Sequence, residues 1–156
     1  MEKSTRHSKI TGNFGEGLVL YWLSKHGFEC ATLDHTGIDL IARHPRTEEV
    51  LGISVKSRSR AVGTEGTHIN LRKVDFEKAT KACDAFHCTP YYAIVADEPP
   101  YMRALLLPLS HLLNICPGGE KISAWSMSES SLGRYRADPA IHYFELQMTG
   151  DRWWPV

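Results

Sequence analysis

Three ionisable residues stand at positions where a globular chain rarely places charge without a partner. Asp39 lies inside the apolar run at 38–42, and Lys56 closes the mainly apolar run at 52–56. Glu16 lies in a segment with helical spacing. A carboxylate buried in a strand is costly unless it binds a cation or pairs with an amine. These residue types allow a cation site or an ion pair. From spacing alone, the simpler interpretation is an inert, exposed Asp39–Lys56 pair at a sheet edge.

Apolar periodicity predicts the elements that would position these side chains. Apolar residues between positions 14 and 22 recur at helical spacing, whereas residues 50–57 alternate as in a strand. That alternation places Ser54 and Lys56 on one face of the strand. In chain order we expect a helix at 13–26, strands at 28–33, 38–42 and 50–57, a loop at 58–68, a helix at 71–86 capped by Asn70, strands at 91–96 and 102–108, a short helix or turn at 109–115, strands at 121–127 and 141–148, and a surface loop at 128–139.

The order of these elements predicts the fold class. A helix, three strands, a helix and a strand are typical of an α/β sandwich on a mixed sheet. The helix at 71–86 permits a crossover to the strand at 91–96, which is apolar enough to be central. A chain of 156 residues is the size of one domain. We expect a single domain over 1–156, with its core at about 12–115 and a C-terminal extension at about 116–156. The tryptophans of the segment Trp153-Trp154-Pro155 should dock on the body.

Charge and composition narrow the classes of protein. Lys plus Arg equals Asp plus Glu, 18 against 18, so any nucleic-acid contact must come from a local basic patch. Residues 1–9 lack the apolar core of a signal peptide, and no apolar run approaches the ~20 residues that span a bilayer. Four cysteines without a CxxC pair indicate reduced thiols, with a metal clip at Cys83, His87 and Cys88 as the less favoured alternative. We expect a cytoplasmic protein that does not contact membranes.

The order of three short motifs resembles that of a known superfamily. The chain carries GE at 15–16, GIDLIA at 37–42 and ISVKSR at 53–58. In this order, on a helix and two strands, they resemble the PD-(D/E)xK nuclease-like superfamily. The resemblance is closest to archaeal Holliday-junction resolvase-like and restriction-endonuclease-like members, and it covers about residues 12–97. It implies a restriction-endonuclease-like fold: a two-layer or three-layer α/β sandwich with an α-β-β-β-α-β core and a mixed central sheet.

The resemblance also implies roles for individual residues. Asp39 matches the first metal-binding aspartate, and Glu16 matches the accessory glutamate on the first helix. Lys56 matches the lysine that positions the attacking water and stabilises the charged transition state. The backbone carbonyl of Val55 would be an additional metal ligand. The implied cofactor is magnesium or manganese, because such ions prefer carboxylate and water oxygens.

One position departs from the family pattern. The family has Asp or Glu two residues before the lysine, and this chain has Ser54. A hydroxyl is a poor substitute for a carboxylate in binding a hard dication. The missing acid could be replaced by Glu16, or by Glu48 or Glu49 at the start of the same strand, although Glu49 has the wrong parity unless a bulge intervenes. Alternatively, the domain is a catalytically inactive relative, or the resemblance is accidental.

Basic residues follow the proposed motif. Lys56, Arg58 and Arg60 alternate, so they should point the same way, and Arg72 and Lys73 open the next helix. Together they could contact phosphates beside Asp39. The alternative is a solvated basic edge that discourages aggregation. His35, four residues before Asp39, is the loop histidine most worth testing.

Three hypotheses follow for the function. The first is a metal-dependent phosphodiesterase or endonuclease that acts on DNA, with Asp39, Glu16 and Lys56 as its catalytic residues and a homodimer as a possible assembly. The second is an inactive nuclease-fold domain that binds nucleic acid or a protein partner through its basic residues. The third is an unrelated α/β domain with a structural Asp39–Lys56 pair.

Overall fold

The centre of the molecule is one mixed sheet. The structure, a computed structural model, describes residues 3–60, 63–64 and 67–148. The main sheet has six strands in the order β1-β2-β3-β5-β6-β8, with β3 and β5 parallel and the other neighbours antiparallel. These strands are β1 (Glu29–Thr32), β2 (Leu40–Arg43), β3 (Val50–Ser59), β5 (Thr89–Glu98), β6 (Tyr101–Pro108) and β8 (His142–Gln147).

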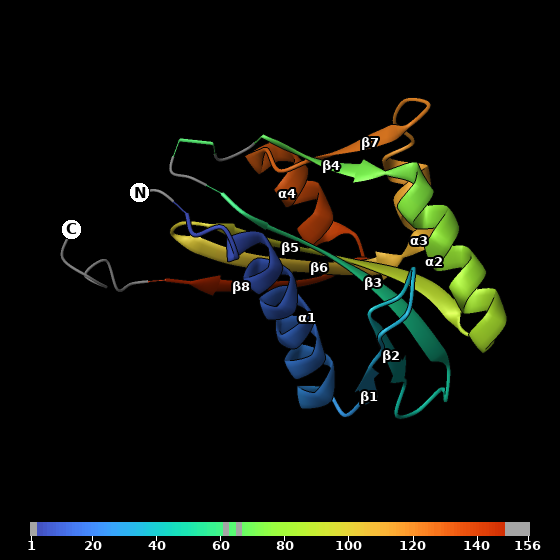
Figure 1. The fold of residues 1–156 in the computed structure, drawn as a ribbon. Helices are drawn as coiled ribbons and strands as arrows, with labels where there is room; N and C mark the ends of the chain where they lie inside the picture. Colours follow the sequence, from blue (N-terminus) through green and yellow to red (C-terminus); the bar gives the residue numbers. More distant parts are fainter. Residues whose placement is uncertain (1–2, 61–62, 65–66, 149–156) are drawn as a thin grey trace.

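Helices cover both faces of this sheet, so the domain has three layers (Figure 1). The helix α1 (His7–Lys25) packs on one face. The other face carries α2 (Lys73–Phe86), α3 (Leu109–Ile115), α4 (Glu129–Ala137) and a two-stranded ribbon of β4 (His68–Arg72) and β7 (Ile122–Ser126). The α-β-β-β-α-β core and the mixed sheet are therefore confirmed.

The apolar sequence of β5 explains its central place. Tyr92, Ile94 and Ala96 face the core under α2, while Ala93 and Val95 face the core under α1. All five are buried, because helices cover the strand on both sides. The strand lies between β3 and β6, which confirms the prediction that this segment is central.

Several local predictions were wrong. The helix α1 begins at His7 rather than Asn13. Asn70 does not cap a helix but lies in β4, where burial alternates between Ile69 and Leu71 inside and their polar neighbours outside. The surface loop expected at 128–139 contains α4, whose first turn is capped by the Ser128 hydroxyl.

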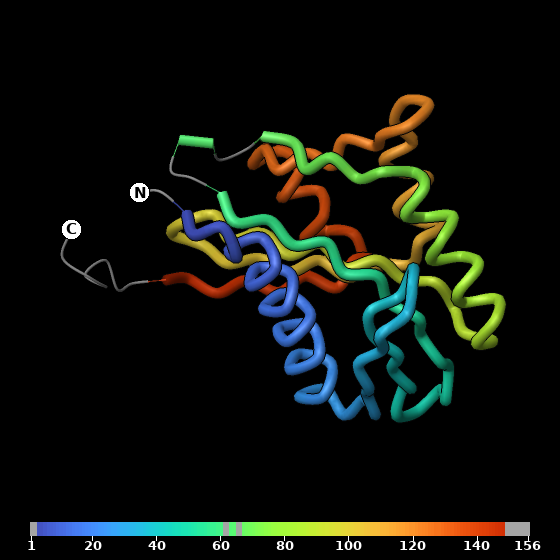
Figure 2. Tube along the Cα trace, viewed as in Figure 1, coloured from blue at the N-terminus to red at the C-terminus, as the bar shows by residue number. Residues whose placement is uncertain are grey.

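The segment after residue 116 takes part in both sheets. β7 pairs with β4, and β8 runs along β6 although the two strands are distant in sequence (Figure 2). Trp125 of β7 is fully buried and stacks on Tyr135 of α4, with ring centroids 4.2 Å apart. The β7 and α4 part of this segment therefore covers one face of the main sheet, and β8 extends the sheet at its edge. The expected docking of Trp153-Trp154-Pro155 falls outside the described residues.

Gly37 fixes the approach of the loop before β2 to the helix α2. Its φ is +114°, and a Cβ there would lie 2.4 Å from the backbone oxygen of Lys78. Both the left-handed backbone and the contact with helix backbone favour glycine.

Among the described residues, no helix is long and apolar enough to cross a membrane.

Gly37→Ala should lower the free energy of unfolding by at least about 2 kcal/mol, because neither the backbone angle nor the helix can yield cheaply. Urea denaturation measures the effect. Gly12→Ala in α1 is the control, since nothing lies within 4 Å of the added Cβ and alanine favours a helix. Equal stability of the two variants would contradict the close packing of this loop on α2.

Candidate active site

Asp39 directly precedes β2 and is held between the end of β1 and β3 by three hydrogen bonds. Its N–H donates to the Ile53 carbonyl at 2.8 Å, and its carbonyl accepts from the Leu33 N–H at 2.8 Å. Its carboxylate oxygen Oδ2 accepts from the Val55 N–H at 2.6 Å. The regular β2–β3 pairing stops at Leu40, so the side chain satisfies a β3 donor beyond the end of that pairing. The carboxylate is therefore fixed in position.

A small pocket of about 200 Å³ brings this carboxylate together with residues from three other elements. Ser54 and Lys56 point into it from the face of β3 that packs under α2. Tyr92 closes it from β5, and Asp75 lines it from the first turn of α2. With Thr36 and Lys78 also lining it, the pocket combines two carboxylates, two hydroxyls, a phenol and two amines.

Asp75 was missed in the sequence analysis. It lies in a helix with acidic and basic residues on several sides, so its type alone gave no signal. Both of its oxygens accept from Arg72, with Nε–Oδ2 at 2.9 Å and Nη2–Oδ1 at 2.8 Å. The Arg72 side chain is 62% exposed and that of Asp75 is 18% exposed. Asp75 is thus paired with an exposed arginine side chain that has room to move.

Burial shifts the protonation of the groups in this pocket. It raises the pKa of Asp39, and the Val55 N–H and the Lys56 charge only partly offset this rise. It lowers the pKa of Lys56, as does the charge of Arg58, against the opposing carboxylates of Asp75 and Asp39. A carboxyl that resists ionisation beside an amine that resists protonation is typical of functional sites.

Glu16 lies close enough to sense Asp39. Burial raises the pKa of Glu16, and the negative charge of Asp39 raises it further. The approach of α1 to β3 depends on Gly15, where a Cβ would overlap the Ser57 side chain. Glu16 does not line the small pocket, however. Within the part of the chain that the structure describes, no three His, Cys, Asp or Glu side chains converge as a metal site.

The other acids suggested for this site lie elsewhere. Glu48 pairs with Arg43 at 2.7 Å, and Glu49 lines a different cavity. Neither therefore replaces the carboxylate missing at Ser54. His35 does not line the pocket of Asp39. Its ring packs edge-on against Phe86, with ring centroids 5.1 Å apart.

The basic residues divide into two groups. Arg58 is exposed. Arg72 is also exposed and pairs with Asp75, which lines the pocket. Lys73 is half-buried at the start of α2, where its N–H donates to the Lys121 carbonyl at 3.0 Å. Arg60 is only 9% exposed and pairs with Glu98 at 2.8 Å. The prediction that Arg60 contacts phosphate is therefore wrong, because its guanidinium pairs with a buried carboxylate.

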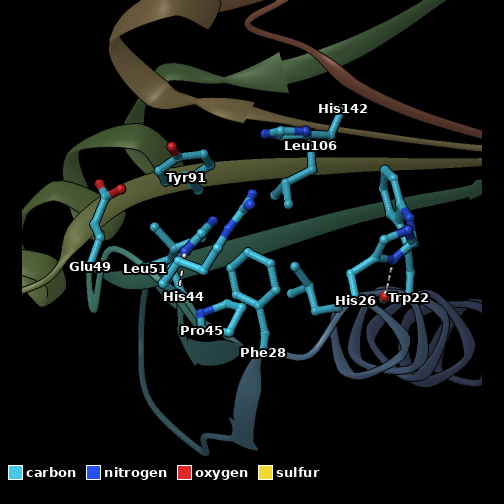
Figure 3. Close-up of a pocket in the computed structure, with 12 residues that line it drawn as sticks. Trp22, His26, Phe28, His44, Pro45, Glu49, Leu51, Tyr91, Leu106 and His142 are labelled. Carbon is cyan, nitrogen blue, oxygen red and sulfur yellow. Dashed lines mark hydrogen bonds between the residues drawn. The ribbon is translucent and has the colours of Figure 1, made fainter.

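A larger cavity of about 500 Å³ lies on the other face of the sheet (Figure 3). Trp22, Phe28 and Leu51 give it apolar walls, and the rings of His26 and His44 stand at its sides. It shares no lining residue with the pocket of Asp39. The two cavities are separated by the sheet, so this one does not belong to the candidate active site.

Comparisons with known proteins agree with the architecture. No protein-family model matches the chain, and no curated protein matches it either. Among solved structures, the Holliday junction resolvase Hjc of the archaeal hyperthermophile Archaeoglobus fulgidus matches with a TM-score of 0.56 and 20% identity. The match covers 79% of this chain and 88% of that chain. At 20% identity, the match is evidence for the fold alone. The chain therefore shares the fold of that protein, which is the restriction-endonuclease-like fold expected from the sequence.

Proposed function

We propose that this protein is a metal-dependent phosphodiesterase that acts on DNA, with its active site in the pocket of Asp39. The observation that carries the proposal is the pocket itself. It unites Asp39 and Lys56 with a second acid, Asp75, which comes from α2 instead of from the position of Ser54. The proposed set keeps two carboxylates beside one amine, although the motif acid on β3 is absent.

The donor set suits a hard dication. Asp39 keeps one carboxylate oxygen beyond the hydrogen bond to Val55, and the Ser54 hydroxyl and the carboxylate of Asp75 lie in the same pocket. Magnesium and manganese favour such oxygens together with water. When bound, the ion would supply a more acidic water and a positive charge against the phosphate. Glu16, whose pKa is raised by burial and by the charge of Asp39, is the acid that would complete the shell from the α1 side.

Each side chain then has a distinct role. The Val55 N–H holds the Asp39 carboxylate in one orientation, so little order is lost when a cation binds. The half-buried ammonium of Lys56 provides positive charge where negative charge develops on the phosphate. Arg72 leaves Asp75 and neutralises a phosphate at the pocket rim, while the exposed Arg58 contacts the next one.

A second candidate function is supported by the two hydrogen bonds that Arg72 donates to the Asp75 carboxylate. If Arg72 stays on Asp75, only Asp39 of the two pocket carboxylates remains for a cation, and the domain would bind DNA without cutting it. The two functions differ in one assay. Supercoiled plasmid and a four-way junction, the substrate in the name of the Archaeoglobus protein, are incubated with Mn²⁺ or with EDTA. Metal-dependent cleavage favours the enzyme. Binding that weakens with salt and with Arg58→Ala, without cleavage, favours the binding domain.

Asp75→Asn should reduce metal-dependent cleavage by about 10²-fold or more, the size expected when one preorganised charge is lost from an active site. The variant should also lose most of the shift in melting temperature on Mn²⁺ addition, because fewer anionic ligands remain. The cleavage rates of the native protein and of the variant are measured on the same plasmid.

Glu77→Gln is the matched control, because Glu77 is an exposed acid two positions along the same helix and does not line the pocket. It should leave cleavage and the Mn²⁺ shift unchanged. Full activity of the Asp75→Asn enzyme would remove Asp75 from the proposed site.

A further inference from the structure

Two cysteines meet at the C-terminal end of α2. The Cys88 N–H donates to the Cys83 carbonyl at 3.0 Å, and the His87 N–H donates to the Asp84 carbonyl at 3.4 Å. His87 has a φ of +53°, in the left-handed region. This pair of bonds around a left-handed residue is the Schellman ending of a helix, which brings the residues in the places of Cys83 and Cys88 into side-chain contact.

The neighbouring strand leaves room for both sulfur atoms. A Cβ on Gly52 of β3 would lie 2.5 Å from the Sγ of Cys83 and 2.6 Å from the Sγ of Cys88. Both sulfurs therefore lie within 2.6 Å of one point, in the space that the glycine leaves empty. A disulfide needs Cα atoms about 4.4–6.8 Å apart. The backbone hydrogen bond from Cys88 to Cys83 holds these two residues close together.

The two thiols differ in access. Cys83 is buried and Cys88 is half-buried, and both are free. Burial, with Cys88 as its neighbour, raises the pKa of the Cys83 thiol to about 12. Cys88 is therefore the first of the two that an oxidant in solution reaches, and Cys83 is the resolving thiol.

We propose that Cys83 and Cys88 form a redox-modification site that closes to an intramolecular disulfide when the protein meets a peroxide. The Cys88 sulfur attacks the O–O bond of hydrogen peroxide, becomes a sulfenic acid and releases water. The Cys83 sulfur then forms the S–S bond and displaces the sulfenic oxygen as a second water. In sum, two thiols lose two protons and two electrons, and one peroxide is reduced to two waters. A dithiol reductant reverses the change.

This site is independent of the proposed nuclease activity. The disulfide would join two residues of the α2 ending and would pack over Gly52, which lies two residues before Ser54. The chemistry needs only the two thiols and an oxidant. Its test therefore stands whether or not the protein cuts DNA.

The test is a labelling experiment on the full reduced chain. The protein is treated with hydrogen peroxide, free thiols are blocked with one alkylating reagent, and oxidised thiols are then reduced and blocked with a heavier one. Cys83 and Cys88 share one tryptic peptide, 82–103, whereas Cys30 and Cys116 lie in two others. Before the final reduction, we expect peptide 82–103 to lose the mass of two hydrogens. Both of its cysteines should take the second label at least about 10-fold faster than Cys30 and Cys116.

Variants separate the pair from an ordinary reactive thiol. Cys88→Ser should leave Cys83 in the first label at peroxide doses that oxidise the native pair, because Cys83 is buried. Cys83→Ser should trap Cys88 as a sulfenic acid that reacts with dimedone. Cys116→Ser should change nothing. The inference is overturned if Cys83 and Cys88 take the second label independently, if Cys88 proceeds to the sulfinic acid in the native chain, or if Cys30 or Cys116 reacts first.

Discussion

Asp39→Asn should strongly reduce metal-dependent DNA cleavage and at the same time raise the urea midpoint at pH 7. The loss of rate should reach roughly 10²–10³-fold, because one fixed anionic group disappears from the proposed site. The gain in stability has a separate cause. Burial raises the pKa of Asp39, so the ionised form is unfavourable in the folded state at neutral pH. An asparagine oxygen can still accept from the Val55 N–H without carrying the charge.

The pH dependence follows from the direction of this shift. A carboxyl whose pKa is higher in the folded state binds its proton more tightly there than in the unfolded chain. The cost of ionisation is absent below the unfolded value of 3.8 and grows until the pH exceeds the folded value. The stability advantage of Asp39→Asn should therefore shrink as the pH falls toward 3.8.

Asp34→Asn serves as the control, since Asp34 is exposed in the same loop. It should alter neither cleavage nor the urea midpoint. An Asp39→Asn variant that cleaves DNA normally would refute the proposed active site. A variant that is inactive but less stable would show that the carboxylate bond to Val55 outweighs the cost of burial.

Glu98→Gln should lower the free energy of unfolding by about 3 kcal/mol, because it leaves two buried guanidinium groups without their shared negative charge. The Glu98 side chain is only 1% exposed. It pairs with Arg60 at 2.8 Å and with Arg103 at 3.0 Å. Removing one member of a buried charge group is far more costly than removing an exposed pair. Urea denaturation at pH 7 measures the difference.

Glu129→Gln provides a matched control for this network. Glu129 lies 3.9 Å from the same Arg103 guanidinium, but its side chain is 81% exposed. Its replacement should have little effect on stability, because solvent screens such pairs. Similar losses from the two variants would mean that burial does not govern the strength of the Glu98 contacts.

The sequence predicted the part of the candidate site that depends on local pattern. Alternation along β3 placed Ser54 and Lys56 on one face, and the apolar run around Asp39 marked its neighbouring strand. Asp75 could not be predicted in this way. It reaches the pocket only because the chain passes through β4 before α2 begins, and β4 is held by pairing with the distant β7.

The same limit explains the wrong interpretation of Arg60. Alternation was extended from Lys56 through Arg58 to Arg60 as if one strand carried all three residues. In the structure β3 ends at Ser59, and the Arg60 side chain turns inward to Glu98. Period-two reasoning holds inside a strand and fails at its end. The buried carboxylate of Glu98 also needs a positively charged partner, and Arg60 supplies it.

The edge position of β8 has a consequence for biosynthesis. β6 is almost entirely buried, and its outer backbone groups are paired with β8. A nascent chain that still lacks residues 142–147 must leave this apolar strand with an open hydrogen-bonding edge, which invites pairing with other chains. During synthesis, β8 leaves the ribosome after β6. In that interval the edge of β6 is exposed, and chaperones would be needed to prevent its pairing with other chains.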